Sequence, residues 1–178
     1  MKETRSKKIT KNSPISSKTK RNPQINFAID LLMSNQKDTA QRICEETLRE
    51  NPFDADAQDL LAVISCQNKS WDEALVFADK AIALNKDNGE FYNHRAIIYK
   101  NLGNYEEAIS NYKLATGLLP SSAEPLYNLA ILLMEIGDLN KALKVNKKAA
   151  RLDPNNIHIS NNLGAIFQKL GLFEQASS

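Results

Sequence analysis

Apolar and small side chains recur at three- and four-residue intervals within residues 89–120, which is the spacing of one face of an α-helix. Two such stripes are separated by Gly103, a residue suited to the left-handed backbone that ends a helix. Pro120 follows the second stripe and stops a helix, because it has no backbone donor. The pattern therefore predicts two helices joined by a tight turn. The stripes consist of Tyr92, Ala96 and Tyr99, and then Ala108, Tyr112 and Ala115.

Small residues repeat this pattern along the chain at a fixed step of 34 residues. Ala and Gly suit positions where two helices cross closely, because a larger side chain would push the helices apart. A period of this length that contains two helices is typical of an α-solenoid, in which each helix pair buries its apolar face against its neighbours. Two of the series are Ala40, Ala74, Ala108, Ala142 and Ala176, and Ala28, Ala62, Ala96, Ala130 and Gly164.

The phase of these series resembles that of tetratricopeptide repeats, which place small residues at fixed positions and a proline near the end of each repeat. The resemblance implies an all-α fold, an α-solenoid in which antiparallel helix pairs form a right-handed superhelix. Ser65 and Arg95 depart from the family pattern in the second and third repeats. Lys37 breaks the aromatic or leucine series in the first repeat, which matches the pattern least. The array is expected over residues 22–178, with repeats at about 21–54, 55–88, 89–122 and 123–156 and an incomplete repeat at 157–178.

Capping signals precede the second helix of several pairs. Ser70 with Glu73, and Asn104 with Glu107, have the spacing of a capping box. Asp138 is suited to cap the corresponding helix of the next repeat. We therefore expect these side chains to accept hydrogen bonds from the first turns of their helices.

Charge is distributed unevenly along the chain. Residues 1–21 carry eight Lys or Arg and one acid, whereas the remainder carries 15 basic and 20 acidic residues. With few sizeable apolar residues, this segment cannot offset the entropy of ordering and is expected to be a disordered basic tail. Three roles are open to it: a solubilising tail, a tether to anionic lipid or nucleic acid, or an occupant of the groove of the acidic array.

Neither an export signal nor a membrane span is evident in the sequence. The basic start lacks the apolar core of a secretory signal, and the apolar runs are too short to cross a bilayer. Cys44 and Cys66 fit no disulfide framework and indicate free thiols in a reducing compartment. We therefore expect a cytoplasmic protein.

No motif for catalysis, phosphate binding or metal binding is present in the sequence. His94 and His158 fall two repeats apart, which at ~10 Å per packed helix layer is too far for one metal ion. The basic run of the fourth repeat is interpreted as a solvated helix face, not as a specific nucleic-acid site. We expect a protein that is not an enzyme and that needs no cofactor or metal.

The resemblance to tetratricopeptide repeats also implies a groove lined by the first helix of each pair. At one groove position Asn26, Asn128 and Asn162 recur, with Leu60 and His94 between them, similar to the asparagine ladder in the repeat arm of O-GlcNAc transferases. A carboxamide can donate to and accept from the main chain of an extended peptide. Alternatively, these residues simply solvate a concave face. The expected groove residues are Asn26, Asn93, His94, Ile97, Lys100, Tyr127, Asn128, Ile131, Asn161 and Asn162.

The carboxylate clamp of other tetratricopeptide proteins, which grips the acidic end of chaperone peptides, is not expected. The positions that would supply its cations read as Ile, Asp and Val in the first two repeats. Asp56, Glu90 and Glu124 line the groove instead and would repel an acidic peptide.

These observations favour a non-catalytic scaffold that binds an extended peptide or a partner segment in the groove. An alternative is the amino-terminal, substrate-recruiting arm of a larger transferase, such as one of the O-GlcNAc type. The last repeat supports either view, because its second helix is short and would leave Leu163, Ile166 and Phe167 incompletely covered. That open end would be completed by further sequence, by a partner or by self-association. A weaker third option is an adaptor that contacts nucleic acid or a membrane surface through the basic tail.

Overall fold

The computed structural model describes residues 21–171 of the 178-residue chain. Within this range the backbone forms nine α-helices and no strands, which confirms the predicted all-α solenoid of helix pairs. Of the expected basic tail over residues 1–21, all but Arg21 lie outside the described residues, as does the short second helix expected in the last repeat. The helices are α1 (Pro23–Met33), α2 (Lys37–Glu50), α3 (Ala55–Gln67), α4 (Trp71–Leu84), α5 (Gly89–Asn101), α6 (Tyr105–Leu118), α7 (Glu124–Glu135), α8 (Leu139–Leu152) and α9 (Ile157–Lys169).

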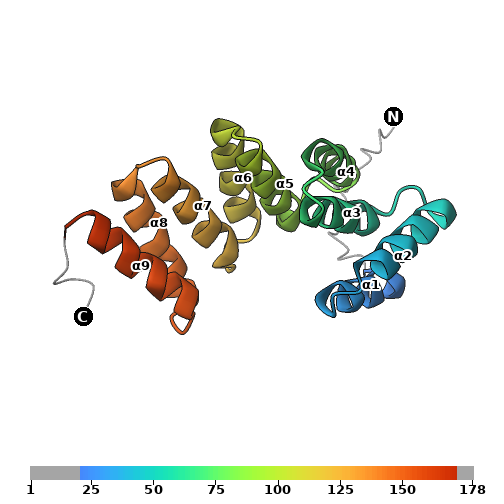
Figure 1. Ribbon diagram of the computed structural model, residues 1–178, viewed down its shortest axis with the longest axis horizontal. Helices are drawn as coiled ribbons and strands as arrows, with labels where there is room; N and C mark the ends of the chain where they lie inside the picture. Colours follow the sequence, from blue (N-terminus) through green and yellow to red (C-terminus); the bar gives the residue numbers. More distant parts are fainter. Residues whose placement is uncertain (1–20, 172–178) are drawn as a thin grey trace, which may run out of the picture.

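Each odd-numbered helix up to α7 packs on the even-numbered helix that comes next, and successive pairs line up along the long axis of the molecule (Figure 1). Neighbouring odd-numbered helices also contact one another, whereas within residues 21–171 no even-numbered helix contacts another one. The odd-numbered helices therefore line the inner side of the array. We call their surface that faces away from the even-numbered helices the inner face.

Alanines fill the crossings between helices, as the 34-residue period predicts. Larger side chains complete the core between the pairs: Phe91 and Tyr112 are at most 1% exposed. Burying one such aromatic side chain stabilises the fold by roughly 1.5–3 kcal/mol. All described alanines of the two 34-residue series have no exposed surface: Ala28, Ala40, Ala62, Ala74, Ala96, Ala108, Ala130 and Ala142.

The turn inside each helix pair requires a left-handed backbone residue. Gly103, Gly137 and Gly171 adopt φ angles of 79°, 84° and 72° at this position, as predicted for Gly103. Asn35 and Lys69 occupy the same position in the first two pairs with φ near 60°. Asn tolerates this conformation better than most residues with a Cβ atom, so the backbone strain falls mainly on Lys69.

The predicted capping boxes at Ser70 and Asn104 are wrong. Neither side chain accepts a hydrogen bond from its helix, although both residues stand at the N-cap position. Glu73 accepts a hydrogen bond from Ser65 Oγ at 3.1 Å instead. Asp138 does cap α8, because its carboxylate accepts from the Lys141 amide. Side-chain caps that the sequence pattern did not reveal begin four of the five odd-numbered helices, α1, α3, α5 and α9, at Asn22, Asp54, Asn88 and Asn156.

The expected open apolar end on α9 is also wrong for two of its three residues. Ile166 has no exposed surface and Phe167 is 7% exposed, while Leu163 is half-buried. Ile166 joins a core cluster with Leu132 and Leu133, and the Lys147 ammonium lies 5.5 Å from the centre of the Phe167 ring. These contacts with the preceding pair cover the apolar side of α9.

Candidate functional site

The predicted groove residues lie on α1, α5, α7 and α9, and their exposure divides them into three groups. Asn26 and Asn161 are exposed, whereas Asn93 and Asn162 are buried. The remaining six are half-buried, so part of each side chain is open to a ligand. These six are His94, Ile97, Lys100, Tyr127, Asn128 and Ile131.

A polar network links α5 to α7 on the inner face. Asn93 Nδ2 donates to Glu124 Oε1 at 3.1 Å, and Asn93 Oδ1 accepts from Asn128 Nδ2 at 3.2 Å. Nearer the ends of the same helices, Lys100 Nζ lies 2.9 Å from Glu135 Oε1. Asn93 and Asn128, both predicted groove residues, are therefore in contact. Asn93 holds two α7 side chains in place, those of Glu124 and Asn128.

A second carboxamide network links α8 to α9. Asn146 has no exposed surface, and its Nδ2 donates to the Ile159 carbonyl at 2.8 Å. Asn162 Nδ2 donates to Asn146 Oδ1 at 3.3 Å. Asn162, one of the predicted ladder residues, is thus turned toward α8 and bonded within the chain. A buried amide that finds both partners contributes about 1 kcal/mol, and it costs more when left unpaired.

His94 and Asp59 form an ion pair between α5 and α3. His94 Nδ1 lies 2.8 Å from Asp59 Oδ2, and the Asp59 side chain is only 10% exposed. Burial lowers the pKa of His94, but the adjacent Asp59 carboxylate, with support from Glu124 and Glu90, raises the pKa above its ordinary value. The raised pKa favours the imidazolium form, so His94 keeps its positive charge on the inner face to a higher pH than a free histidine does.

A hollow of about 200 Å³ opens between α1, α3 and α5. Acidic and basic side chains stand around it: Asp56, Asp59 and Glu90 on one hand, and Arg21 and His94 on the other. We call this site the amino-terminal hollow. Its apolar lining consists of Ile25, Ile29, Leu32, Met33, Leu60 and Val63.

Arg21 bridges two carboxylates at the edge of the amino-terminal hollow. Its Nη2 lies 3.0 Å from Glu90 Oε2 and its Nε lies 3.5 Å from Asp56 Oδ1. Burial raises the pKa of Asp56; Arg21 opposes this, but Asp54 and Asp59 add repulsion, so the net pKa is raised. One arginine therefore does not compensate the burial and crowding of the acids around it.

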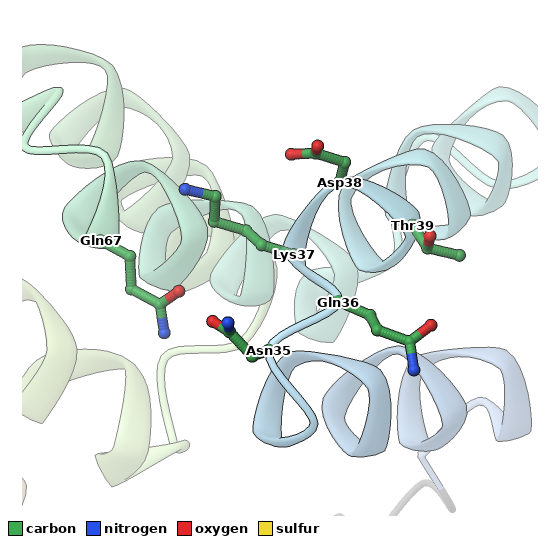
Figure 2. Close-up of a pocket in the computed structure, with 6 residues that line it drawn as sticks. All are labelled: Asn35, Gln36, Lys37, Asp38, Thr39 and Gln67. Carbon is green, nitrogen blue, oxygen red and sulfur yellow. The ribbon is translucent and has the colours of Figure 1, made fainter.

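Two other hollows lie at helix ends. One, of about 550 Å³, lies at the turn between α1 and α2 beside the end of α3, where Lys37 takes the place of the aromatic or leucine residues Trp71, Tyr105 and Leu139. Figure 2 shows Lys37 reaching toward Gln67, with Asn35 beside them, and Lys37 Nζ donates to Asn68 Oδ1. A flexible lysine fills this position less completely than a ring would, and we attribute the wide, polar hollow to this difference.

The third hollow, of about 460 Å³, lies between the α6–α7 and α8–α9 connections. Tyr127, a predicted groove residue, lines it together with Glu124, Asp153 and His158. Because Tyr127 and Glu124 also belong to the inner face, this hollow extends that face toward the helix starts.

The sequence predicted acidic residues along the groove, Asp56 and Glu90 among them, but not their pairing with basic side chains. Asp59 is 7% exposed and paired with His94 on the inner face. A signal was present: the two residues are 35 positions apart, one repeat plus one residue. Side chains at that offset lie on neighbouring odd-numbered helices, at repeat positions that differ by one residue. Asn93 and Asn128 have the same offset.

Reactive chemistry is not supported by the described side chains. Burial raises the pKa of Cys44 to about 12 and that of Cys66 to about 11, so both thiols stay protonated and unreactive. Across residues 21–171, no three His, Cys, Asp or Glu side chains gather in a way that could hold a metal ion. None of the helices α1–α9 has the length and apolar character needed to span a bilayer.

Comparison with known families matches repeat models to three stretches of the chain. A model described as tetratricopeptide repeat matches residues 25–89, a second of the same description matches residues 77–110, and one described as TPR repeat matches residues 132–171. No curated protein matches the chain in sequence.

Solved structures of repeat proteins share the fold. A PilF structure from Pseudomonas aeruginosa is 21% identical with a TM-score of 0.78, over 89% of this chain and 77% of that one. MamA from Desulfovibrio magneticus RS-1 is 17% identical with a TM-score of 0.72, over 89% and 92%. YrrB, described as a TPR protein with an unusual peptide-binding site, is 21% identical with a TM-score of 0.64, over 88% and 81%. At these identities the likeness shows the fold.

Proposed function

The chain is a solenoid of tetratricopeptide repeats, and we propose that it is a non-catalytic scaffold whose inner face binds an extended segment of a partner protein. The observation that carries the proposal is the amino-terminal hollow, where an apolar floor from α1 and α3 is open to solvent between charged side chains. Apolar lining with a few placed polar groups is the usual character of a binding site. The peptide-binding description of YrrB supports the proposal by analogy of fold.

Four predicted groove residues take a defined role in this proposal. Asn128 uses Nδ2 to reach Asn93, and no other described residue donates to its Oδ1. That oxygen can accept an N–H from the main chain of a bound segment. Exposed Asn161, one helix layer further along, can both donate and accept. The ladder is therefore proposed to run over Asn128 and Asn161, with Asn93 and Asn162 holding the inner face in shape.

The half-buried residues between these amides supply contact surface. Ile97 and Ile131 are apolar and only half-buried on α5 and α7, and Tyr127 offers a ring with a polar tip. Asn26, at the other end of the array, is exposed on α1. A segment that runs along the inner face would pass all four, so binding would depend on backbone contacts along its whole length.

The test uses a phage-displayed library of random 12-residue peptides as the probe, selected on the full chain. Val63 lines the amino-terminal hollow, and Val76 is 53% exposed on outer helix α4, so the two valines form a matched pair. Val63→Asn should weaken selected peptides by about tenfold or more, because it places an amide on the apolar floor. Val76→Asn should leave affinity unchanged. Peptides that bind equally well to both variants would contradict the proposal.

The transferase-arm alternative uses the same inner face and differs only in adding a catalytic domain after the array. The proposal therefore covers it: in either setting the inner face recruits the partner, and residues 21–171 contribute no catalytic group. The cytoplasm stays the proposed location, on the argument of two free thiols. Fractionation of cells that express the tagged full chain would test it, and recovery with an exported fraction would contradict it.

A further inference from the structure

The amino-terminal hollow combines two features that one ligand would have to match. Its floor is apolar, formed by Ile29, Leu60 and Val63 among others, and two of its acids, Asp56 and Glu90, remain 27% and 53% exposed. A purely apolar segment would leave these acids beside a low-dielectric surface, and an acidic segment would be repelled. The surface therefore discriminates by charge as well as by shape.

Charge around the hollow is incompletely balanced. Three negative charges line the hollow, on Asp56, Asp59 and Glu90. The basic groups that can balance them are Arg21 and the imidazole of His94. His94 is already committed to Asp59 at 2.8 Å, which leaves Arg21 to serve both Asp56 and Glu90. The raised pKa of Asp56 is the expected consequence of burial and of the acids nearby.

Arg21 shows where a ligand cation would lie. Its guanidinium spans from α3 to α5 by pairing with Asp56 and with Glu90, at 3.5 Å and 3.0 Å. Its own backbone precedes α1, so no helix fixes this side chain to its position. A cation delivered by another chain could take the same place, since the two carboxylates belong to different helices and face the same space.

We propose that the amino-terminal hollow selects partner segments that present an apolar side chain next to a lysine or arginine, the apolar group on the α1–α3 floor and the cation on Asp56 and Glu90. This inference rests on the proposed function and names the chemistry of the partner. In this proposal Arg21 is an intramolecular competitor. Its guanidinium pairs with Asp56 and Glu90 until a ligand cation replaces it.

Selection from the 12-residue peptide library tests this proposal through its sequence statistics. Peptides enriched on the full chain should contain Lys or Arg adjacent to an apolar residue more often than the unselected library. On the double variant Asp56→Asn with Glu90→Gln, that preference should disappear and the affinity of basic peptides should fall about tenfold. Raising the salt from about 50 mM to 500 mM should weaken the unmodified chain and have little effect on the variant.

A matched control is available on the outer helices. Asp56 and Glu90 are the second residues of α3 and α5, and Asp72 and Glu106 are the second residues of α4 and α6. Asp72→Asn with Glu106→Gln therefore makes the same change in net charge and in helix-terminus charge. This control should bind basic peptides as the unmodified chain does.

Arg21→Gln separates competition from a structural role. If Arg21 competes, its removal should tighten basic peptides severalfold, whereas a structural contact would lose affinity or leave it unchanged. An exposed ion pair contributes little to stability, so the variant should fold.

Three results would overturn the inference. Selected peptides that depend on Val63 but lack basic residues would refute it while leaving the proposed function standing. No selection of inner-face binders would refute both. Binding of basic peptides that appears only when Lys18 and Lys20 are replaced by Gln would assign the hollow to the chain's own basic segment instead.

Discussion

The two ends of the inner face are built on the same repeat but carry different chemistry. Between α1, α3 and α5 the face has an apolar floor ringed by charges, with Arg21, Asp56 and Glu90 at its edge. Between α5, α7 and α9 it carries carboxamides beside half-buried Ile97, Tyr127 and Ile131, and Asn93 and Asn128 are bonded across the helices. The repeat fixes where the inner positions lie, and the residue at each position decides what the face can bind.

This difference indicates a division of labour along one bound segment. The charged end can choose a partner by its side chains, because charge and apolar contact depend on residue type. The carboxamide end can hold the main chain of almost any segment. Both ends depend on the same buried alanine crossings, so substitutions should have their largest effect in the shared core and smaller effects toward each end.

The largest loss of stability is expected from Ala108→Glu, because Ala108 lies in the core between the two ends. Ala108 has no exposed surface and lies in a cluster with Ala96, Tyr112 and Leu129. The longer, charged side chain overpacks this crossing and buries an unpaired carboxylate, at a cost of about 3–5 kcal/mol. Thermal denaturation should show a large loss of stability, whereas Ser110→Glu at an exposed position of the same helix should change little.

Asn146→Ala should destabilise the carboxamide end by about 2 kcal/mol. It removes the partner of the Ile159 carbonyl and of Asn162, both of which are buried. Asn140→Ala, at an exposed site on the same helix, is the control. Denaturant titration of the two variants measures the difference. Equal stabilities would mean that the α8–α9 carboxamide network does not hold the face in shape.

His94→Gln should reveal a pH dependence confined to the charged end. The pKa of His94 is raised in the folded protein, chiefly by Asp59 acting against burial. The His94–Asp59 pair therefore stabilises the fold fully below the unfolded pKa of about 6.5, and the contribution is lost as pH rises through the higher folded pKa. Melting curves from about pH 5.5 to 8.5 should show the unmodified chain losing its advantage over His94→Gln as pH rises.

The same substitution at the other histidine is the control for this titration. His158 is exposed and forms no ion pair with a described residue. His158→Gln therefore removes a histidine without breaking an ion pair, and its comparison with His94→Gln isolates the loss of the pair with Asp59. An advantage over His94→Gln that grew with rising pH would contradict the assigned direction of the pKa shift.

The smallest effect is expected from Lys100→Gln, at the junction of the two ends. Lys100 and Glu135 are 26% and 44% exposed, and solvent screens their attraction. Losing this ion pair should cost about 0.5 kcal/mol, and less at high salt. A denaturation midpoint that moved as far as that of Asn146→Ala would show that α5 and α7 are coupled through charge and not through carboxamides.

The sequence predicted the helices and their stacking because small residues at close crossings cannot vary freely. Ala96 and Ala108 are fixed by the distance between backbones, and their 34-residue period carries that constraint into the sequence. Gly103 and Pro120 likewise mark backbone requirements that few residues meet. The fold class and the helix pairs could therefore be predicted from the sequence alone.

Pairing between side chains could not be read in the same way. Asn162 was expected to face a ligand, yet it turns to Asn146 on the neighbouring helix. Asp59 was expected at a groove position, yet its burial against His94 was not predicted. The partner of each side chain depends on its rotamer and on which neighbouring side chain lies closer. Neither can be predicted from a single sequence. Residue positions on the inner face were predictable, and their partners were not.

The central claim is that partner segments bind along the inner face, and it is tested most directly by nuclear magnetic resonance mapping. A peptide from the library selection would be titrated into the isotope-labelled full chain, and amide shifts tracked residue by residue. The account predicts that the largest shifts fall on α1, α3, α5 and α7, at residues such as Val63, His94 and Asn128. Shifts concentrated on α4, α6 and α8, with the inner face unmoved, would contradict it.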